Sequence, residues 1–330
     1  MSNAEGSSDI EVISAGGNAL LDPKDNSVEG QRLAARVASE FVAELIDAGE
    51  KVIVTHGNGP QVGFMKNRVA LALSKVHNVP LDALVANSQG ALGYMIEQEV
   101  YNALIRRGYT PENADRIRTV VCQVVVEGLG EKTKPIGPFM TEEEAQKMMA
   151  QFPGMEIKKR SDAKDPTRAW REHVYSPIPR EVLGLRDIRR LLDARTAVIY
   201  GGGGGVPVVR EPDGTLRGIE GVVDKDAASQ KIASDPVIRA RRLSIFTEAE
   251  GVIDPEKYPN GPVIRELTLS EAKDLWPKLP KGTMGPKLKA CADFVESTGN
   301  SALIASLRQM RGAFLRSEAG TIVHLGKPMI

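Results

Sequence analysis

Three short glycine-containing turns, each placed directly after an apolar run, constrain this chain more than any other feature. They are Ala15–Asn18, His56–Pro60 and the five-glycine run Gly201–Gly205. Glycine tolerates positive φ, and successive unobstructed N–H groups before a helix form a concave site for anions. Glycine is common after strands, so one such turn would mean little. Three of them predict a polyphosphate site at one edge of a parallel sheet.

Strand-like and helix-like segments alternate along the chain, which is the pattern of a layered α/β fold. Short apolar runs predict strands at 11–14, 51–55, 119–127, 196–200, 243–247, 301–304 and 321–324. Apolar residues at helical spacing predict helices at 27–48, from 61 onward, and at 88–107, 181–193, 227–232, 269–275 and 287–297.

The composition of the chain changes after residue 127. Residues 128–179 are polar and contain six prolines. A stretch of this length inside a compact domain favours an inserted subdomain or lid over a plain loop. We therefore predict one domain over 9–330 with a protruding lid subdomain at about 122–179. Residues 1–8 are expected to be a disordered leader or the remnant of a tag.

The composition excludes several classes of function. The chain has 43 basic and 43 acidic side chains, and zero net charge argues against broad binding to nucleic acid or to an anionic membrane. No apolar run approaches the roughly 20 residues of a spanning helix, and no secretory signal is evident. Cys122 and Cys291 lie in unrelated contexts, which predicts reduced, buried thiols in a cytoplasmic protein.

Three lysines beside turn residues, Lys134, Lys225 and Lys287, are the candidate chemical groups. Phosphoryl transfer to an anionic acceptor must offset charge on both substrates, so positioned cations carry much of the catalysis. An isolated lysine is usually a solvated surface group. Lys225 departs furthest from that reading because aspartates flank it. Lys287, at a helix start, is open to two interpretations, an anion ligand or an exposed surface group. Lys134 is held between prolines and glycine, as a lid residue would be.

Other nucleotide motifs are absent or incomplete. No Gly-x-x-x-x-Gly-Lys-Ser/Thr sequence is present, so the chain is not a P-loop enzyme. A dinucleotide dehydrogenase is disfavoured because Ala15–Asn18 lacks the required glycine spacing. His56 is open to two readings, a catalytic base or a residue that satisfies backbone groups of its turn.

The order and spacing of several stretches resemble those of carbamate kinases, in the amino-acid-kinase superfamily. These stretches are 16–20, 56–63, 88–90, 123–126, 133–139, 201–207, 223–226 and 282–287. The similarity runs from about Val12 to the last predicted strand. The block around Lys134 separates carbamate kinases from acetylglutamate, aspartate and uridylate kinases.

The resemblance implies a three-layer αβα sandwich with a central mostly parallel sheet, a small protruding subdomain and a homodimer. It implies reversible phosphoryl transfer between ATP plus carbamate and ADP plus carbamoyl phosphate. Magnesium (Mg2+) would be carried by the nucleotide phosphates rather than by protein ligands. We expect the reaction to run toward ATP synthesis in arginine metabolism, with no nucleic-acid or membrane partner.

The resemblance also implies roles for individual residues. Lys225 and Lys287 would stabilise the transferring phosphoryl group, and Asp226 would organise these lysines. Lys134 would reach the substrate from the protruding subdomain. The predicted substrate-binding and phosphate-binding residues are Gly16, Gly17, Asn18, Gly57, Asn58, Gly59, Ser88, Gln89 and Gly90. The predicted nucleotide-binding residues are Gly202, Gly203, Thr247, Glu248, Met284 and Gly285.

Two stretches depart from the family pattern. Family members usually carry an arginine where this chain has Glu172, followed here by His173 and Tyr175. Reversing the charge near the base of the subdomain would change its affinity for a small anion. Glu248 and Glu250 stand where aspartates are usual, which moves each carboxylate outward by roughly one methylene and alters nucleotide contacts.

Two other functions stay open on the residues alone. One is a kinase of the same superfamily that acts on another small carboxylate or carbamate-like acid. The other is a catalytically impaired nucleotide-binding sensor. The joint presence of the three lysines and Asp226 counts against the sensor, because loss of a phosphoryl-stabilising cation is the simplest route to inactivity.

Overall fold

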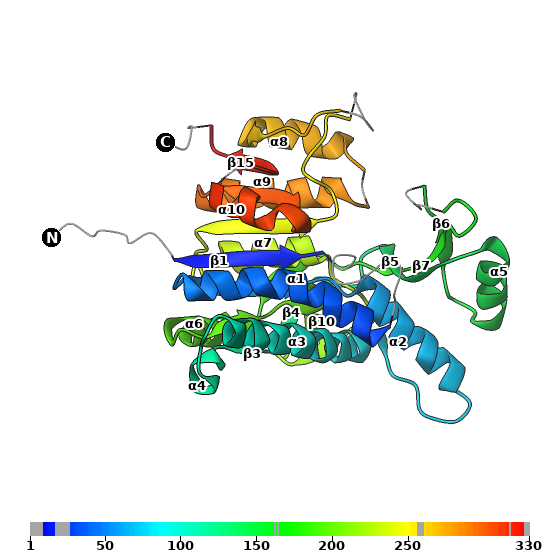
Figure 1. Ribbon diagram of the computed structural model, residues 1–330. Helices are drawn as coiled ribbons and strands as arrows, with labels where there is room; N and C mark the ends of the chain where they lie inside the picture. Colours follow the sequence, from blue (N-terminus) through cyan, green and yellow to red (C-terminus); the bar gives the residue numbers. More distant parts are fainter. Residues whose placement is uncertain are drawn as a thin grey trace.

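An eight-stranded sheet forms the centre of the molecule (Figure 1). The computed structural model describes residues 9–16, 27–161, 163, 165–255, 261–280, 282–316 and 318–326, so the predicted leader lies outside them. In spatial order the strands are β13 (Glu266–Thr268), β15 (Thr321–His324), β14 (Ala302–Ser306), β12 (Arg242–Thr247), β1 (Ile10–Ala15), β2 (Lys51–His56), β9 (Ala197–Ile199) and β3 (Ile117–Thr119). Every neighbouring pair is parallel except β14 with β15.

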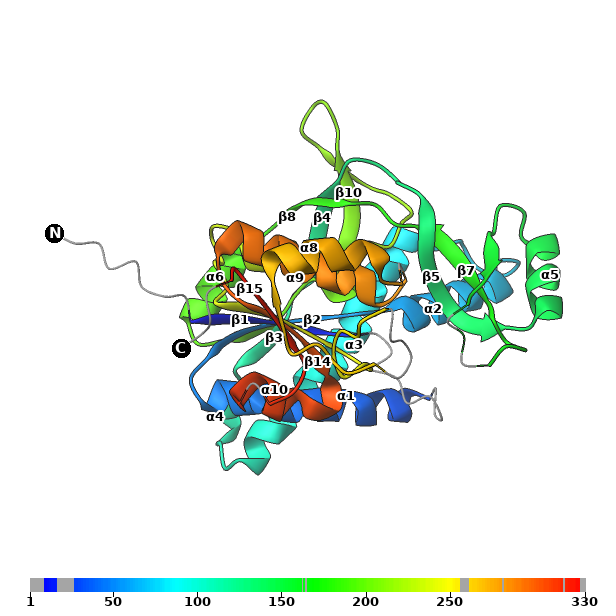
Figure 2. The same ribbon diagram turned by 90° about the horizontal axis from the view of Figure 1, so that it is seen from above.

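Helices cover both faces of this sheet. One face carries α1 (Val28–Asp47), α3 (Leu81–Arg106) and α10 (Met310–Arg316), and the other carries α6 (Leu185–Asp193), α7 (Lys225–Ser234), α8 (Leu269–Leu275) and α9 (Met284–Thr298). Figure 2 shows α1 and α10 on one side and α8 and α9 on the other. Successive strand residues point to opposite faces, so Val12 packs toward α7 and α9 while Ile13 packs toward α1. The predicted αβα sandwich is confirmed.

A second sheet of four strands packs against the face that carries α6 and α7. Its order is β11 (Leu216–Gly218), β10 (Val206–Arg210), β4 (Gln123–Val126) and β8 (Pro179–Val182). Val124 and Val182 are buried in the same apolar cluster as Leu185 of α6 and Ala228 of α7. The apolar pattern of the sequence does not distinguish the strands of this sheet from those of the central one.

The prediction of one strand over 119–127 is wrong. β3 ends at Thr119, the chain crosses from the central sheet to the second sheet, and β4 begins at Gln123. Cys122 lies in the crossing, where the Gln89 side chain bonds both of its backbone groups. A continuous valine-rich run looks the same whether it serves one sheet or two, so the crossing leaves no mark on the apolar pattern.

Two predicted helices begin elsewhere. The helix predicted at 181–193 begins at Leu185, because the preceding residues form β8 and Gly184, at φ 79°, turns the chain. The helix predicted from Ser88 begins at Leu81, directly after Pro80. Its first two turns bury apolar residues in a separate cluster with the neighbouring α2 (Gly59–Ala72).

A small lobe, residues 132–175, projects from one end of the molecule (Figure 1). It consists of β5 (Lys132–Met140), α5 (Glu142–Gln151), β6 (Ile157–Lys159) and β7 (Trp170–Tyr175), with antiparallel strands in the order β5-β7-β6. Met140, Ala145 and Ile157 form an apolar cluster of its own. Its division from the main domain and its role as a lid stay predictions.

The lobe rests on α2. A Cβ on Gly63 of α2 would lie 2.1 Å from the Gly137 Cα, so the two backbones touch. Val62 and Ile136 share one buried cluster at this junction. In Figure 1 the arrow of β1 points toward the lobe, so the carboxyl ends of strands parallel to β1 face this end of the molecule.

The structure bears on two predictions made from composition: that the cysteines are buried thiols and that the chain has no membrane-spanning helix. Cys122 and Cys291 are free and buried, and burial raises the pKa of the Cys122 thiol to about 12. Among the described residues, no helix combines the length and the apolar character that crossing a membrane requires.

Candidate active site

The turns after β1, β2 and β9 meet at the carboxyl edge of the central sheet. β1 and β2 pair with Ala15 opposite His56, and the Gly57 N–H donates to the Ala15 carbonyl at 3.0 Å. The Gly16 N–H donates to the carbonyl of Phe246 in β12 at 2.9 Å, which ties the first turn to the next strand. Gly17 and Asn18 lie outside the described residues.

The five-glycine run after β9 packs tightly against its surroundings. Four of its residues have positive φ, between 63° and 88°. A Cβ on Gly203 would lie 2.1 Å from the Asn58 amide, and one on Gly204 would lie 2.4 Å from the Val223 carbonyl oxygen. Glycine alone fits both the dihedral angles and the space. The run therefore brings the end of β9 against the turn after β2 and against the residues that precede α7.

Asp226 lies between two lysines at the start of α7. Its Oδ1 accepts a hydrogen bond from Lys225 Nζ at 2.5 Å, and its Oδ2 accepts one from Lys287 Nζ at 2.9 Å. Lys287 belongs to the first turn of α9, so two helices on one face of the sheet start at this point. Lys225 is 7% exposed and Asp226 is 2% exposed. One buried carboxylate thus holds two ammonium groups side by side.

Ser14, in β1, ties this cluster to the central sheet. Its hydroxyl accepts a hydrogen bond from Lys225 Nζ at 2.7 Å. Ser229 lies one turn along α7, and its Oγ is 3.3 Å from Ser14 Oγ and 2.7 Å from the hydroxyl of Thr55 in β2. None of these three hydroxyls was predicted from the sequence. For Ser14 and Thr55 the available signal was a polar residue near the end of an otherwise apolar strand, just before a glycine turn. Ser229, inside α7, offers no such signal.

Asp224 connects the lobe to the cluster. Its Oδ1 caps α7 by accepting hydrogen bonds from the N–H groups of Asp226 and Ala227, at 2.9 and 3.3 Å. Its Oδ2 accepts one from Lys134 Nζ at 2.7 Å. Lys134 lies on β5, so a lobe residue reaches the start of α7. From the sequence, Asp224 is indicated only as a charge beside Lys225.

The charges in the cluster oppose the cost of burial. Burial raises the pKa of the Asp226 carboxyl, but Lys225 and Lys287 outweigh it and hold that pKa well below its usual range. Burial lowers the pKa of Lys225 in spite of Asp226. For Lys287 the charges of Asp226 and Asp224 outweigh burial and raise the pKa. Lys225 is therefore the ammonium group that gives up its proton more readily.

The other predicted substrate residues divide into an inner group and one outer residue. Asn58 Nδ2 donates to Ser88 Oγ at 2.8 Å, and the Gln89 amide accepts from the Cys122 N–H at 2.8 Å and donates to the Cys122 carbonyl at 3.1 Å. Gly90 is exposed on the outer side of α3. It lies apart from the inner group, because consecutive helical residues point in directions about 100° apart, and its contact with substrate stays a prediction.

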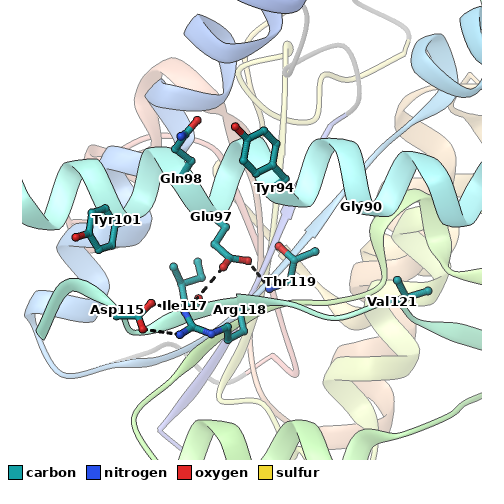
Figure 3. A pocket seen from close by; sticks show the side chains of 10 residues that line it. All are labelled: Gly90, Tyr94, Glu97, Gln98, Tyr101, Asp115, Ile117, Arg118, Thr119 and Val121. Carbon is teal, nitrogen blue, oxygen red and sulfur yellow. Dashed lines mark hydrogen bonds and ion pairs between the residues drawn. The ribbon is translucent and has the colours of Figure 1, made fainter. Parts of the chain in front are cut away.

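Gly90 instead lines an open pocket of about 460 Å³ between α3 and β3 (Figure 3). The close-up shows Glu97 of α3 reaching the Thr119 N–H, at 2.7 Å, and Arg118 pairing with Asp115, at 2.6 Å. None of the three lysines and neither carboxylate of the cluster lines this pocket. The candidate active site is therefore assigned to the lysine cluster and the glycine turns.

The predicted nucleotide-binding residues lie on three segments. Gly202 and Gly203 belong to the glycine run, and Thr247 ends β12, followed by the exposed Glu248. Met284 and Gly285 open α9, two residues before Lys287. The structure thus places these residues at the ends of β9 and β12 and at the start of α9.

Glu172 differs from its expected setting. It is 5% exposed on β7 and forms an ion pair with Lys66 of α2, which neutralises it. The neighbouring Arg171 donates to the Gly137 carbonyl at 2.6 Å and stacks over Phe139. The pairing with Lys66 means that the reversed charge is compensated where the lobe meets the main domain.

His56 is the last residue of β2 and is fully buried. Its Nδ1 lies 3.1 Å from the Gly57 carbonyl oxygen, which only accepts, so this nitrogen carries the proton. Burial and the charge of Lys225 lower the pKa of His56 from 6.5 to about 4. The imidazole is neutral at pH 7 and supports the glycine turn through its backbone bond.

Protonation of His56 is expected to destabilise the fold in acid. The folded-state pKa lies below the unfolded value of 6.5, so its contribution is full above pH 6.5 and lost as pH falls toward 4. The loss amounts to about 3 kcal/mol in the free energy of unfolding. Urea unfolding at several pH values should show a shallower decline in this window for His56→Gln than for wild type. The exposed His77→Gln is the control, and equal slopes for His56→Gln and wild type would contradict the expectation.

Known proteins share the sequence pattern and the fold of this chain. Residues 9–306 match the amino acid kinase family. Carbamate kinase 2 of Staphylococcus aureus (strain MRSA252) is 35% identical over 322 residues, covering 95% of this chain and 98% of that protein. Carbamate kinase from Giardia lamblia bound to citric acid has a TM-score of 0.86 at 32% identity, covering 96% of this chain and 98% of that one. The Giardia enzyme bound to AMP-PNP has a TM-score of 0.81 at 34% identity, with the same coverage.

The chain therefore belongs to the amino acid kinase family. It is an ATP-dependent kinase, and it is similar to carbamate kinases along nearly its whole length.

Proposed function

We propose that this protein is a carbamate kinase, which transfers a phosphoryl group reversibly between ATP plus carbamate and ADP plus carbamoyl phosphate. The observation that carries the proposal is Asp226 paired with both Lys225 and Lys287. Transfer between two anions needs cations fixed at the point of transfer. The similarity to carbamate kinases of Staphylococcus aureus and Giardia lamblia supports the choice of acceptor.

In the direction of ATP synthesis, a β-phosphate oxygen of ADP attacks the phosphorus of carbamoyl phosphate, and the bond from phosphorus to the carbamate oxygen breaks. Lys225 and Lys287 stabilise the negative charge on the transferring group, and Asp226 holds their ammonium groups in place. Lys134 neutralises the leaving carbamate from the lobe side. No residue forms a covalent intermediate, because the positioned cations are sufficient for this chemistry.

The glycine turns would hold the polyphosphate. Gly59 begins α2, where unpaired helix N–H groups favour anions, whereas the Gly57 N–H already donates to the Ala15 carbonyl. Asp226 and Asp224 are engaged by lysines, which leaves the nucleotide phosphates as the place for magnesium. Magnesium held there would supply positive charge that offsets the charge of the phosphate groups. Gly203, Thr247 and Met284 would contact the nucleotide.

We also propose a cytoplasmic location and net flux toward ATP synthesis in arginine breakdown. The free, buried cysteines support a reducing compartment. The direction is tested by measuring ATP, ADP, carbamate and carbamoyl phosphate in cells. Concentrations that favour phosphorylation of carbamate would contradict it.

A homodimer is proposed through the edge of the central sheet at β3. Among the described residues, no strand pairs with the outer edge of β3, and Tyr94 and Val121 beside it are 51% and 53% exposed (Figure 3). An open strand edge beside exposed apolar residues pairs readily with a second copy. Sedimentation that gives the mass of one chain, 35.7 kDa, would contradict the dimer.

The function is tested by ATP formation from ADP, magnesium and carbamoyl phosphate. Turnover by wild type establishes carbamate kinase chemistry. A folded protein that binds ADP but makes no ATP from carbamoyl phosphate would refute the proposal. Activity with a different acyl phosphate alone would instead indicate a kinase for another small carboxylic acid.

Replacing Lys134 with alanine is expected to raise the KM for carbamoyl phosphate by about tenfold or more, with a smaller effect on the KM for ADP. The reason is that Lys134 reaches the cluster from the lobe, through Asp224. Lys132→Ala is the matched control, since Lys132 lies on the same strand but bonds to Gly154 within the lobe. Unchanged kinetics with carbamoyl phosphate in Lys134→Ala would exclude a substrate role.

A further inference from the structure

One buried amide beside the glycine turns has no partner. Gln61 is 4% exposed, and neither its Oε1 nor its Nε2 makes a hydrogen bond to any residue that the structure describes. Buried side-chain amides in native proteins are nearly always paired, because an unpaired one loses its bonds to water without replacement. An amide left unpaired on both atoms is therefore a candidate contact for a ligand.

Neighbouring amides show that the fold can satisfy such groups where they are structural. The Gln89 amide bonds both backbone groups of Cys122, and the Asn58 amide donates to Ser88 Oγ. These two side chains hold the crossing between sheets and the turn after β2. Gln61 takes part in neither arrangement, so its amide is not needed to hold the turn together.

The position of Gln61 relates it to the phosphate turn and to the lobe. It is the third residue of α2, and helical side chains lean toward the helix N-terminus, here toward Gly57–Gly59. Asn58 makes no side-chain bond to the first-turn N–H groups. The lobe covers this turn, because a Cβ on Gly59 would lie 3.5 Å from the carbonyl oxygen of Pro135, the residue after Lys134.

We propose that Gln61 recognises the amino group of the carbamoyl moiety and thereby selects carbamoyl phosphate over other acyl phosphates. Its Oε1 accepts a hydrogen bond from the substrate N–H, and its Nε2 donates one to the substrate carbonyl oxygen. Acetyl phosphate has a methyl group in place of the amino group and offers nothing to Oε1. A site built to bond a substrate N–H discriminates strongly against an analogue that lacks it, because the protein group is then left unpaired. This inference rests on the proposed function.

The experiment measures kcat/KM for ATP formation from carbamoyl phosphate and from acetyl phosphate, with ADP and magnesium. Gln61→Met keeps the length of the side chain and removes both hydrogen-bonding atoms. We expect it to lower kcat/KM for carbamoyl phosphate by about 10- to 100-fold. For acetyl phosphate we expect a change of less than about threefold, because that substrate loses the bond from Nε2 to its carbonyl oxygen but no longer leaves Oε1 unpaired. Gln230→Met is the matched control, since Gln230 is a buried glutamine of α7 whose amide donates to Ser234. Its ratio of the two kcat/KM values is expected to equal that of wild type.

The outcomes separate the inference from the function on which it rests. A wild-type protein that makes no ATP from carbamoyl phosphate overturns both. If wild type is active and both substrates decline in parallel in Gln61→Met, Gln61 has a structural role and the inference fails alone. Unchanged values for both substrates also overturn it, and would mean that ordered water satisfies the amide. A selective loss with carbamoyl phosphate, in a variant whose melting temperature matches wild type, supports it.

Discussion

Replacement of Lys225 with alanine is expected to lower kcat by about 100- to 1,000-fold or more while the protein stays folded. Lys225 Nζ bonds both Asp226 Oδ1 and Ser14 Oγ, so its position is set by a helix and by the central sheet. A cation held this firmly needs no reorganisation when negative charge develops on the transferring group. Its contribution therefore belongs to the transition state, and its loss appears in kcat more than in KM.

The fold is expected to tolerate this change because Asp226 keeps its second partner, Lys287. The measurement is steady-state ATP formation, with circular dichroism and thermal melting as checks on folding. Lys231→Ala is the matched control, since Lys231 lies on the same helix with an exposed side chain. Near-normal turnover in a folded Lys225→Ala protein would remove Lys225 from the proposed mechanism.

The parts of the fold that follow local patterns were predictable from the sequence. β1, β2 and β12 are apolar runs that end at turn residues, and α1 ends near Gly49. Phe41 and Leu45 of α1 pack toward the sheet, whereas Leu33 and Val37 of the same helix are exposed. The crossing between β3 and β4 was not predictable, because Val120 and Val124 look alike although they precede and follow a change of sheet. Sheet membership depends on long-range pairing, of which a single strand carries no local sign.

The candidate site shows the same division. The three lysines and Asp226 stand beside turn residues, which the sequence displays directly. The role of Ser14 depends on its contact with Lys225, which is 211 positions away along the chain. That contact arises only when α7 packs against β1. The sequence shows the reversed charge of Glu172 but not its compensation, because its partner, Lys66, is 106 positions away. Partners of this kind arise from the packing of separate elements rather than from local sequence.

Asp226 is the group whose loss is expected to affect both activity and stability. It is 2% exposed and is the carboxylate shared by Lys225 and Lys287. Asp226→Asn keeps the shape of the side chain but removes the charge, leaving two buried ammonium groups close together. Breaking a buried ion pair from one side costs about 3 kcal/mol or more, because the remaining charge stays buried without compensation. We expect the free energy of unfolding to fall by about this amount near pH 7.

Activity in Asp226→Asn is expected to fall by about 100-fold or more, and its pH dependence gives the sharper test. Burial already lowers the pKa of Lys225, and Asp226 opposes that effect. Without the carboxylate the pKa of Lys225 falls further, so the active ammonium form is lost at a lower pH than in wild type. The alkaline limb of the kcat profile should therefore move toward neutral pH.

The control for Asp226→Asn is Asp293→Asn, because Asp293 forms an exposed pair with Lys289 on α9 and its loss should change stability by less than about 1 kcal/mol. A stability loss in Asp226→Asn without any shift of the alkaline limb would mean that Asp226 holds the two helices together but does not set the charge of Lys225. A stability loss together with a shift of the alkaline limb would mean that Asp226 sets the pKa of Lys225. A purely structural carboxylate would not change the pH at which Lys225 loses its proton.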